Sequence, residues 1–124
     1  MTRDEVEGSL AMLQAIDPIW EMDDDVGNSL SMGMFGQSAY AASVLFEVSG
    51  DRRALNEALR FADNLLFLRN DPENGLVFWT GEREPVWRTK EEGSTNLTYA
   101  GSEQGDIVGH MCVAVGMLIF LDTV

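Results

Sequence analysis

The stretch from Glu103 to Leu121, EQGDIVGHMCVAVGMLIFL, constrains the fold more than any other part of this sequence. After Asp106 it carries no formal charge until Asp122, and the only polar side chain between these two aspartates is His110. A surface helix shows one apolar stripe and one polar face, whereas this stretch is apolar on every side. Its uncharged part, Ile107 to Leu121, is also well under the roughly 20 residues that span a bilayer. We therefore expect an inner helix of a larger helical assembly, with Asp106 and His110 at its start.

The charge balance narrows the range of partners. The 124 residues include 21 acidic and 8 basic side chains, which gives a net charge of -13. Nucleic acids and anionic membrane surfaces are disfavoured, because binding to phosphates needs a basic patch. Neutral ligands, including carbohydrates, remain open, and so does a purely solubilising role for the charge.

The single cysteine, Cys112, excludes an intramolecular disulfide, and we expect it to be a buried thiol. One cysteine and one histidine also argue against a metal site with nitrogen or sulfur ligands, so we predict no metal and no cofactor. The N-terminal sequence MTRDEVEGSL lacks an apolar leader. A cytoplasmic location is the default expectation, with a secreted precursor as the alternative.

The rest of the sequence predicts three further helices. Thr2 and Glu5 form a capping box ahead of an amphipathic helix that ends at Asp17, before a proline. The segment Ser29 to Val48 is almost entirely apolar or small, and we expect the glycines within it to allow close helix packing. After the turn at Gly50, a second amphipathic helix runs to about residue 69.

Residues 76–80 and 85–89 are two short aromatic and β-branched runs around a turn that contains glycine. This pattern predicts a short β-hairpin. The helices themselves alternate between amphipathic and all-apolar. We therefore predict a mainly α fold of the α/α-toroid type, with about four helices that alternate between outer and inner positions. A four-helix bundle that dimerises through its apolar helices is the alternative.

Two helical hairpins cannot close a ring. We therefore interpret residues 1–124 as a single domain that is either part of a larger toroid or a unit that assembles as a homo-oligomer. The connections 17–29 and 70–105 both lead from an outer helix into an inner one, so they should lie at the same end of the fold. Loops at one end of a rigid scaffold commonly carry binding residues.

Aromatic rings suit the flat apolar faces of sugars, and carboxylates suit their hydroxyl groups. We predict that substrate-binding side chains lie on these two connections, at Trp20, Asp24, Trp79, Trp87 and Tyr99. The alternative is that the tryptophans pack over the core.

The predicted catalytic residues are Asp25, Asp106 and His110. Glycoside cleavage generally uses two carboxyl groups on either side of the bond, and Asp25 and Asp106 each precede or open an inner helix. His110 follows Asp106 by one helical turn, so the two side chains can interact. The structural alternatives are a first-turn acid for Asp106, a solvated acidic loop for Asp25 and a core side chain for His110.

The segment DDVG at residues 24–27, followed by AYAASVLFEVSGDRRALNEALRFADNLL, resembles the six-hairpin glycosidases, nearest to the unsaturated glucuronyl hydrolase type. Asp25 and Gly27 match a His-Asp-x-Gly-Phe motif that opens an inner helix in that family, while Asp24 and Asn28 stand at its histidine and phenylalanine. The resemblance implies an α/α toroid that hydrolyses uronic-acid or related glycosides, with the second catalytic aspartate at Asp106.

Two other classes of function remain open. The first is a non-catalytic helical oligomer or sugar-binding protein, whose apolar helices form an obligate interface. The second is a polysaccharide lyase or sugar epimerase that uses Tyr99 or Tyr40 together with His110.

Overall fold

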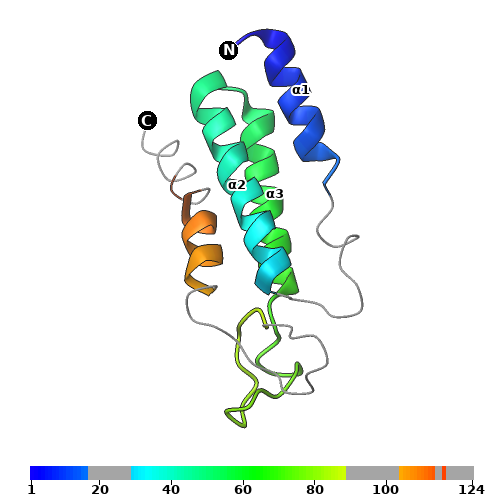
Figure 1. The fold of residues 1–124 in the computed structure, drawn as a ribbon, viewed down its shortest axis with the longest axis vertical. Helices are drawn as coiled ribbons and strands as arrows, with labels where there is room; N and C mark the ends of the chain where they lie inside the picture. The colour runs from blue at the N-terminus through cyan, green and yellow to red at the C-terminus, as the bar shows by residue number, and fades with distance from the viewer. Residues whose placement is uncertain (17–28, 89–103, 114–115, 117–124) are drawn as a thin grey trace.

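The computed structural model describes residues 1–16, 29–88, 104–113 and 116. Its helices are α1 (Arg3–Gln14), α2 (Ser29–Ser49), α3 (Arg52–Leu68) and a fourth helix, residues 104–113, which is unlabelled and orange in Figure 1. The hairpin of α2 and α3 forms the middle of the molecule, with α1 on one side and the fourth helix on the other. The prediction of a mainly α fold with about four helices is confirmed, and the toroidal arrangement stays a prediction.

Local side-chain chemistry sets the helix ends. Thr2 accepts a hydrogen bond from the backbone N–H of Glu5, and the Glu5 carboxylate accepts one from Thr2 N–H, which completes the predicted capping box. Gly50 adopts a φ of 69° in the turn after α2, a conformation that favours glycine. Asp51 then caps α3 by accepting from Arg53 N–H at 3.0 Å.

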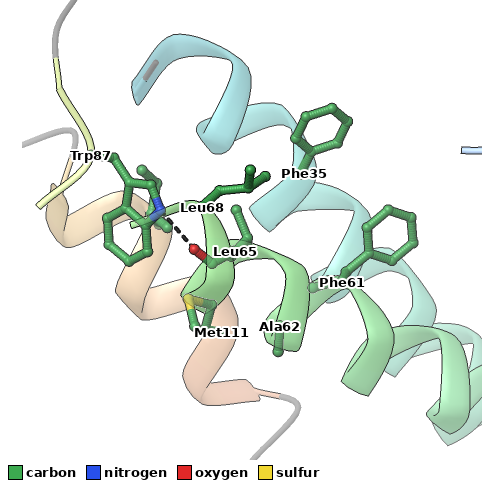
Figure 2. Packing of buried hydrophobic residues seen from close by; sticks show 9 residues of the cluster. Phe35, Phe61, Ala62, Leu65, Leu68, Trp87 and Met111 are labelled. Atoms are coloured by element: carbon green, nitrogen blue, oxygen red, sulfur yellow. Dashed lines mark hydrogen bonds between the residues drawn. The ribbon is translucent and has the colours of Figure 1, made fainter. Parts of the chain in front are cut away.

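The main hydrophobic cluster surrounds α3 (Figure 2). It joins side chains from α2, α3, the loop after α3 and the fourth helix, and α3 supplies the largest share. Burying this much apolar surface is the main favourable contribution to folding. The members are Phe35, Ala39, Phe61, Ala62, Leu65, Leu68, Trp87, Ile107 and Met111.

Helix α1 is attached to this hairpin partly through a polar contact. Leu10 is its one fully buried residue among those described, so apolar packing alone holds it weakly. Arg60 of α3 donates hydrogen bonds of 2.9 and 2.8 Å to the carbonyl oxygens of Leu13 and Ile16, and it pairs with Glu57 at 2.7 Å. Carbonyl groups at a helix C-terminus lack partners within the helix, and Arg60 supplies them for α1.

The predicted β-hairpin is wrong for the part of it that the structure describes, because residues 76–88 form no strand there. The side-chain amide of Asn70 organises this loop instead. It donates to the carbonyl oxygens of Leu76 and Glu84 and accepts from Leu76 N–H, at 2.9 to 3.0 Å. A strand ladder would need these backbone groups as hydrogen-bond partners. They are bonded to the Asn70 side chain instead.

The loop of residues 69–88 lies at the end of the molecule where α2 and the fourth helix begin (Figure 1). The sequence predicts both long connections at this end. The described loop is part of the second connection and lies there, whereas residues 17–28 of the first are outside the described residues. Across the described residues, no helix combines the length and apolarity needed to cross a membrane.

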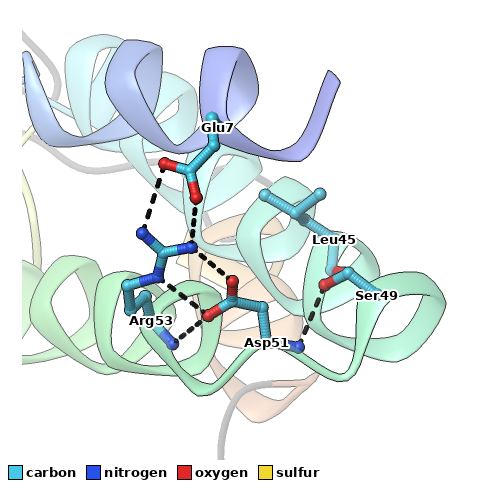
Figure 3. A network of polar contacts seen from close by, with 5 residues as sticks. All are labelled: Glu7, Leu45, Ser49, Asp51 and Arg53. Atoms are coloured by element: carbon cyan, nitrogen blue, oxygen red, sulfur yellow. Dashed lines mark hydrogen bonds and ion pairs between the residues drawn. The ribbon is translucent and has the colours of Figure 1, made fainter. Parts of the chain in front are cut away.

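A polar network ties α1 to the turn between α2 and α3 (Figure 3). Arg53 contacts the Glu7 carboxylate at 2.6 Å and the Asp51 carboxylate at 2.7 Å. These hydrogen bonds from Arg53 lower the pKa of both carboxyl groups below their ordinary values, 4.5 for Glu7 and 3.8 for Asp51. Because Arg53 and Glu7 are exposed to solvent and Asp51 is only partly covered, their contribution to stability is small and depends on salt.

We predict a pH dependence from this network. A carboxyl group whose pKa is lowered by folding adds stability above its unfolded pKa and loses it as the pH falls through the folded value. The contribution of this network to the free energy of unfolding should therefore decrease as the pH falls below 4.5 for Glu7 and below 3.8 for Asp51. Replacing Glu7→Gln should make that decrease shallower in chemical denaturation, whereas Asp63→Asn, at an exposed position on α3, should leave it unchanged. Equal slopes in all three proteins would contradict the prediction.

Candidate functional site

The fourth helix carries Asp106 in its first turn and His110 one turn further on. The Asp106 side chain is 51% exposed, and its Oδ1 lies 3.6 Å from His110 Nδ1. This separation is longer than a hydrogen bond, but it is within the range of an ion pair once His110 is protonated. The structure thus brings together two of the three predicted catalytic side chains.

Tyr40 of α2 joins this pair. Its ring meets the His110 ring edge-on, with centroids 5.6 Å apart and an interplanar angle of 65°. An edge-to-face arrangement at this distance is a favourable aromatic contact. Of the two tyrosines considered from the sequence, Tyr40 is the one that the described residues place beside His110. We refer to Asp106, His110 and Tyr40 as the acid–base cluster.

Two glycines on α2 let the fourth helix approach closely enough to form this cluster. A Cβ atom at Gly33 would lie 3.6 Å from Asp106 Oδ2, and one at Gly36 would lie 3.5 Å from His110 Cβ. Both distances are ordinary van der Waals contacts for a methyl group, so a larger side chain at either position would have to displace the fourth helix. The close helix packing expected for these glycines is present.

His110 Nδ1 is buried and has no hydrogen-bond partner among the described residues. A buried polar atom without a partner is costly in a folded protein. The Asp106 carboxylate lies 3.6 Å from Nδ1, so a proton on Nδ1 would be attracted to Asp106. A carboxylate and an imidazole arranged in this way can hold and pass on a proton.

The two described tryptophans have opposite environments. Trp79, on the loop, is 68% exposed, and its ring is open to a ligand. Trp87 is 4% exposed and donates its indole N–H to the Leu65 carbonyl oxygen at 2.8 Å. Trp87 therefore packs in the core and presents no open face to a sugar. The prediction that it binds substrate is wrong, and the alternative, that it packs over the core, is right for this tryptophan.

Gln104 fastens Trp87 to the fourth helix. Its side-chain carbonyl accepts from the Trp87 backbone N–H at 2.9 Å, and its amide donates to the Trp87 carbonyl oxygen at 2.6 Å. Sequence reasoning missed this residue, because no periodic pattern marks an amide that pairs with the backbone of a distant loop. Gln104 precedes Asp106 by two residues, so the same contact fixes the start of the helix that presents Asp106.

The remaining predicted site residues lie outside the described residues; these are Trp20, Asp24, Asp25 and Tyr99. The proposed pairing of Asp25 with Asp106 therefore stays a prediction. Within the described part of the chain, no three histidine, cysteine, aspartate or glutamate side chains gather where they could hold a metal ion. Cys112 is exposed rather than buried, which corrects the expectation from the sequence.

No protein-family model, curated protein or solved structure matches this chain. The resemblance to six-hairpin glycosidases accordingly rests on the motif residues quoted from the sequence. The geometry that bears on function is the acid–base cluster between α2 and the fourth helix, with an exposed tryptophan on the loop at the same end of the molecule.

Proposed function

We propose that the protein acts on carbohydrates and that Asp106, His110 and Tyr40 form its acid–base centre. The observation that carries this proposal is the convergence of these three proton-carrying side chains, from two helices, around the 3.6 Å contact between Asp106 and His110. Trp79 supports it, because an open aromatic ring at the same end of the molecule can stack on the apolar face of a sugar.

The first candidate reaction is hydrolysis of uronic-acid or related glycosides. Water adds to the anomeric carbon, the glycosidic bond breaks, and a proton goes to the departing oxygen. Asp106 lies in the first turn of its helix with half of its side chain exposed, and it would act as the base or ionised partner. Asp25 would supply the second carboxyl group, and His110 would orient Asp106 and exchange protons with it.

The second candidate is elimination or epimerisation at a sugar acid, and the contact between Tyr40 and His110 favours it. In this reaction a base removes the proton next to the sugar carboxylate. Elimination then forms a carbon–carbon double bond as the glycosidic oxygen leaves, whereas epimerisation returns the proton to the opposite face. A tyrosine and a histidine in contact can share the two proton transfers.

We predict that Asp106→Asn lowers turnover of a responsive glycoside by about 100-fold or more. The change removes a proton-transfer group but keeps its size, so circular dichroism should show an unchanged fold. The assay is a panel of uronic-acid and neutral glycosides, with products identified by mass spectrometry to separate hydrolysis from elimination. Asp63→Asn is the matched control and should retain full activity. Full activity in Asp106→Asn, or no turnover of any glycoside by the unmodified protein, would contradict the proposal.

A further inference from the structure

Helix α2 has an exposed stripe that is independent of the acid–base cluster. Its members alternate in spacing between three and four residues, which is the spacing of a seam between two helices. We call this set the α2 stripe; it comprises Met34, Gln37, Ala41, Val44 and Val48, and all five residues are exposed.

The two ends of the α2 stripe differ in shape. At the Val48 end, α1 and α2 enclose an apolar groove of about 340 Å³, whose lining includes Met12, Ala41, Val44 and Val48. At the other end, Met34 projects from the helix with 65% of its surface exposed. The stripe therefore carries a projecting side chain at one end and a hollow at the other.

We propose that a second copy of this chain binds the α2 stripe, with the two α2 helices antiparallel and related by a two-fold axis at Ala41. Ala41 is midway between Met34 and Val48, so this axis places Met34 of each copy at the Val48 end of the other. Each projecting methionine then enters a groove on its partner. An interface of this kind is isologous, since both copies use the same surface.

The distribution of charge favours a second copy in this orientation. The chain carries a net charge of -13, yet α2 has no charged side chain from Ser29 to Phe46. Self-association through most other surfaces would oppose like charges, whereas the α2 stripe brings together neutral surfaces. The nearest charge, Glu47, lies six positions from Ala41, so the two copies of Glu47 would be about 18 Å apart along the antiparallel helices. That distance exceeds the screening length of about 8 Å at physiological ionic strength, while a parallel pair would place them side by side.

The small side chain of Ala41, at the centre of the α2 stripe, also favours the packing of two helices. Ala41 lets two helix backbones approach closely at the axis, and larger side chains on either side fill the space that remains.

The first test is the mass of the unmodified protein by analytical ultracentrifugation over a range of concentrations. We expect a monomer–dimer equilibrium that shifts toward dimer as salt screens the net charge. Ala41→Glu should raise the dissociation constant by about 100-fold or more, because it buries unpaired charges at the axis. Met34→Glu should do the same from a second position. Phe67→Glu, which changes an exposed phenylalanine on α3, is the matched control and should leave the dimer intact.

The second test measures orientation by disulfide cross-linking, with Cys112→Ser as the background. Ala41→Cys should cross-link to itself, and a mixture of Met34→Cys and Val48→Cys should yield the mixed dimer. Met34→Cys alone should stay uncross-linked if the helices are antiparallel.

Three results would overturn the proposal. A monomer at every concentration would show that the α2 stripe does not bind a second copy. A dimer that Ala41→Glu and Met34→Glu leave intact would place the interface elsewhere. Efficient self-cross-linking of Met34→Cys would show a parallel pair. None of these measurements depends on enzymatic activity, so they are separate from the test of the proposed function.

Discussion

Replacing Trp87 by alanine is expected to lower the free energy of unfolding by about 3–5 kcal/mol. The indole ring is 4% exposed within the main hydrophobic cluster, so its removal leaves a cavity between the loop, α3 and the fourth helix. It also removes the partner of the Leu65 carbonyl oxygen. In a continuing helix Arg69 N–H would bond to that oxygen, but here it donates to Leu66 instead, and Trp87 satisfies Leu65.

Equilibrium unfolding in urea at one fixed protein concentration measures this change. Trp79→Ala is the matched control, because it removes the same side chain from the same loop at a position that is 68% exposed. We expect the control to stay within about 0.5 kcal/mol of the unmodified protein. Equal destabilisation by the two changes would mean that Trp87 does not anchor the loop to α3.

Phe61→Ala is the second change with a large expected effect, again about 3–5 kcal/mol. Phe61 lies near the middle of α3 with no exposed surface, and it contacts the cluster that joins α2 to the fourth helix. The Arg60 guanidinium lies 4.7 Å from the centroid of its ring. Loss of the ring therefore weakens the core and also one contact of the arginine that holds the C-terminus of α1.

Helix α3 supplies its own control for this prediction. Phe67 lies six residues further along the same helix and is 70% exposed, so Phe67→Ala should change the free energy of unfolding by less than about 0.5 kcal/mol. Thermal or urea unfolding followed by circular dichroism compares the two variants. A small effect of Phe61→Ala would contradict the assignment of the core to this face of α3.

The helices could be predicted from the sequence because their signals are local. The capping box at Thr2, the glycine at residue 50 and the cap at Asp51 each act within a few residues, and the structure contains all three. The predicted bounds of α2, Ser29 to Val48, differ from the observed Ser29–Ser49 by one residue. Helix ends of this kind depend on neighbours that are visible in the sequence.

The loop after α3 could not be predicted in the same way. Its aromatic and β-branched residues favour strands, but Asn70 bonds backbone groups 6 and 14 residues away. Trp87 likewise finds its partner 22 residues back in the chain. Contacts at such separations depend on the tertiary fold, which overrides local preference for strand.

In the candidate site, too, a local contact could be predicted from the sequence, whereas a contact between helices could not. The contact between Asp106 and His110 follows from helical spacing alone and could be predicted. Tyr40 could not be chosen over Tyr99 from the sequence, because its position beside His110 depends on how α2 and the fourth helix pack. Gly33 and Gly36 lie on the face of α2 that contacts Asp106 and His110, so that packing involves residues far apart in the sequence.

The two hydrogen bonds between Gln104 and the Trp87 backbone have a mechanical consequence. They connect Trp87, at the end of the loop that carries Trp79, to the first turn that carries Asp106. Turning the fourth helix about its own axis would break both bonds and pull on the tryptophan anchored in the core. A load applied at the tip of the loop would therefore be transmitted to the orientation of the Asp106 carboxylate.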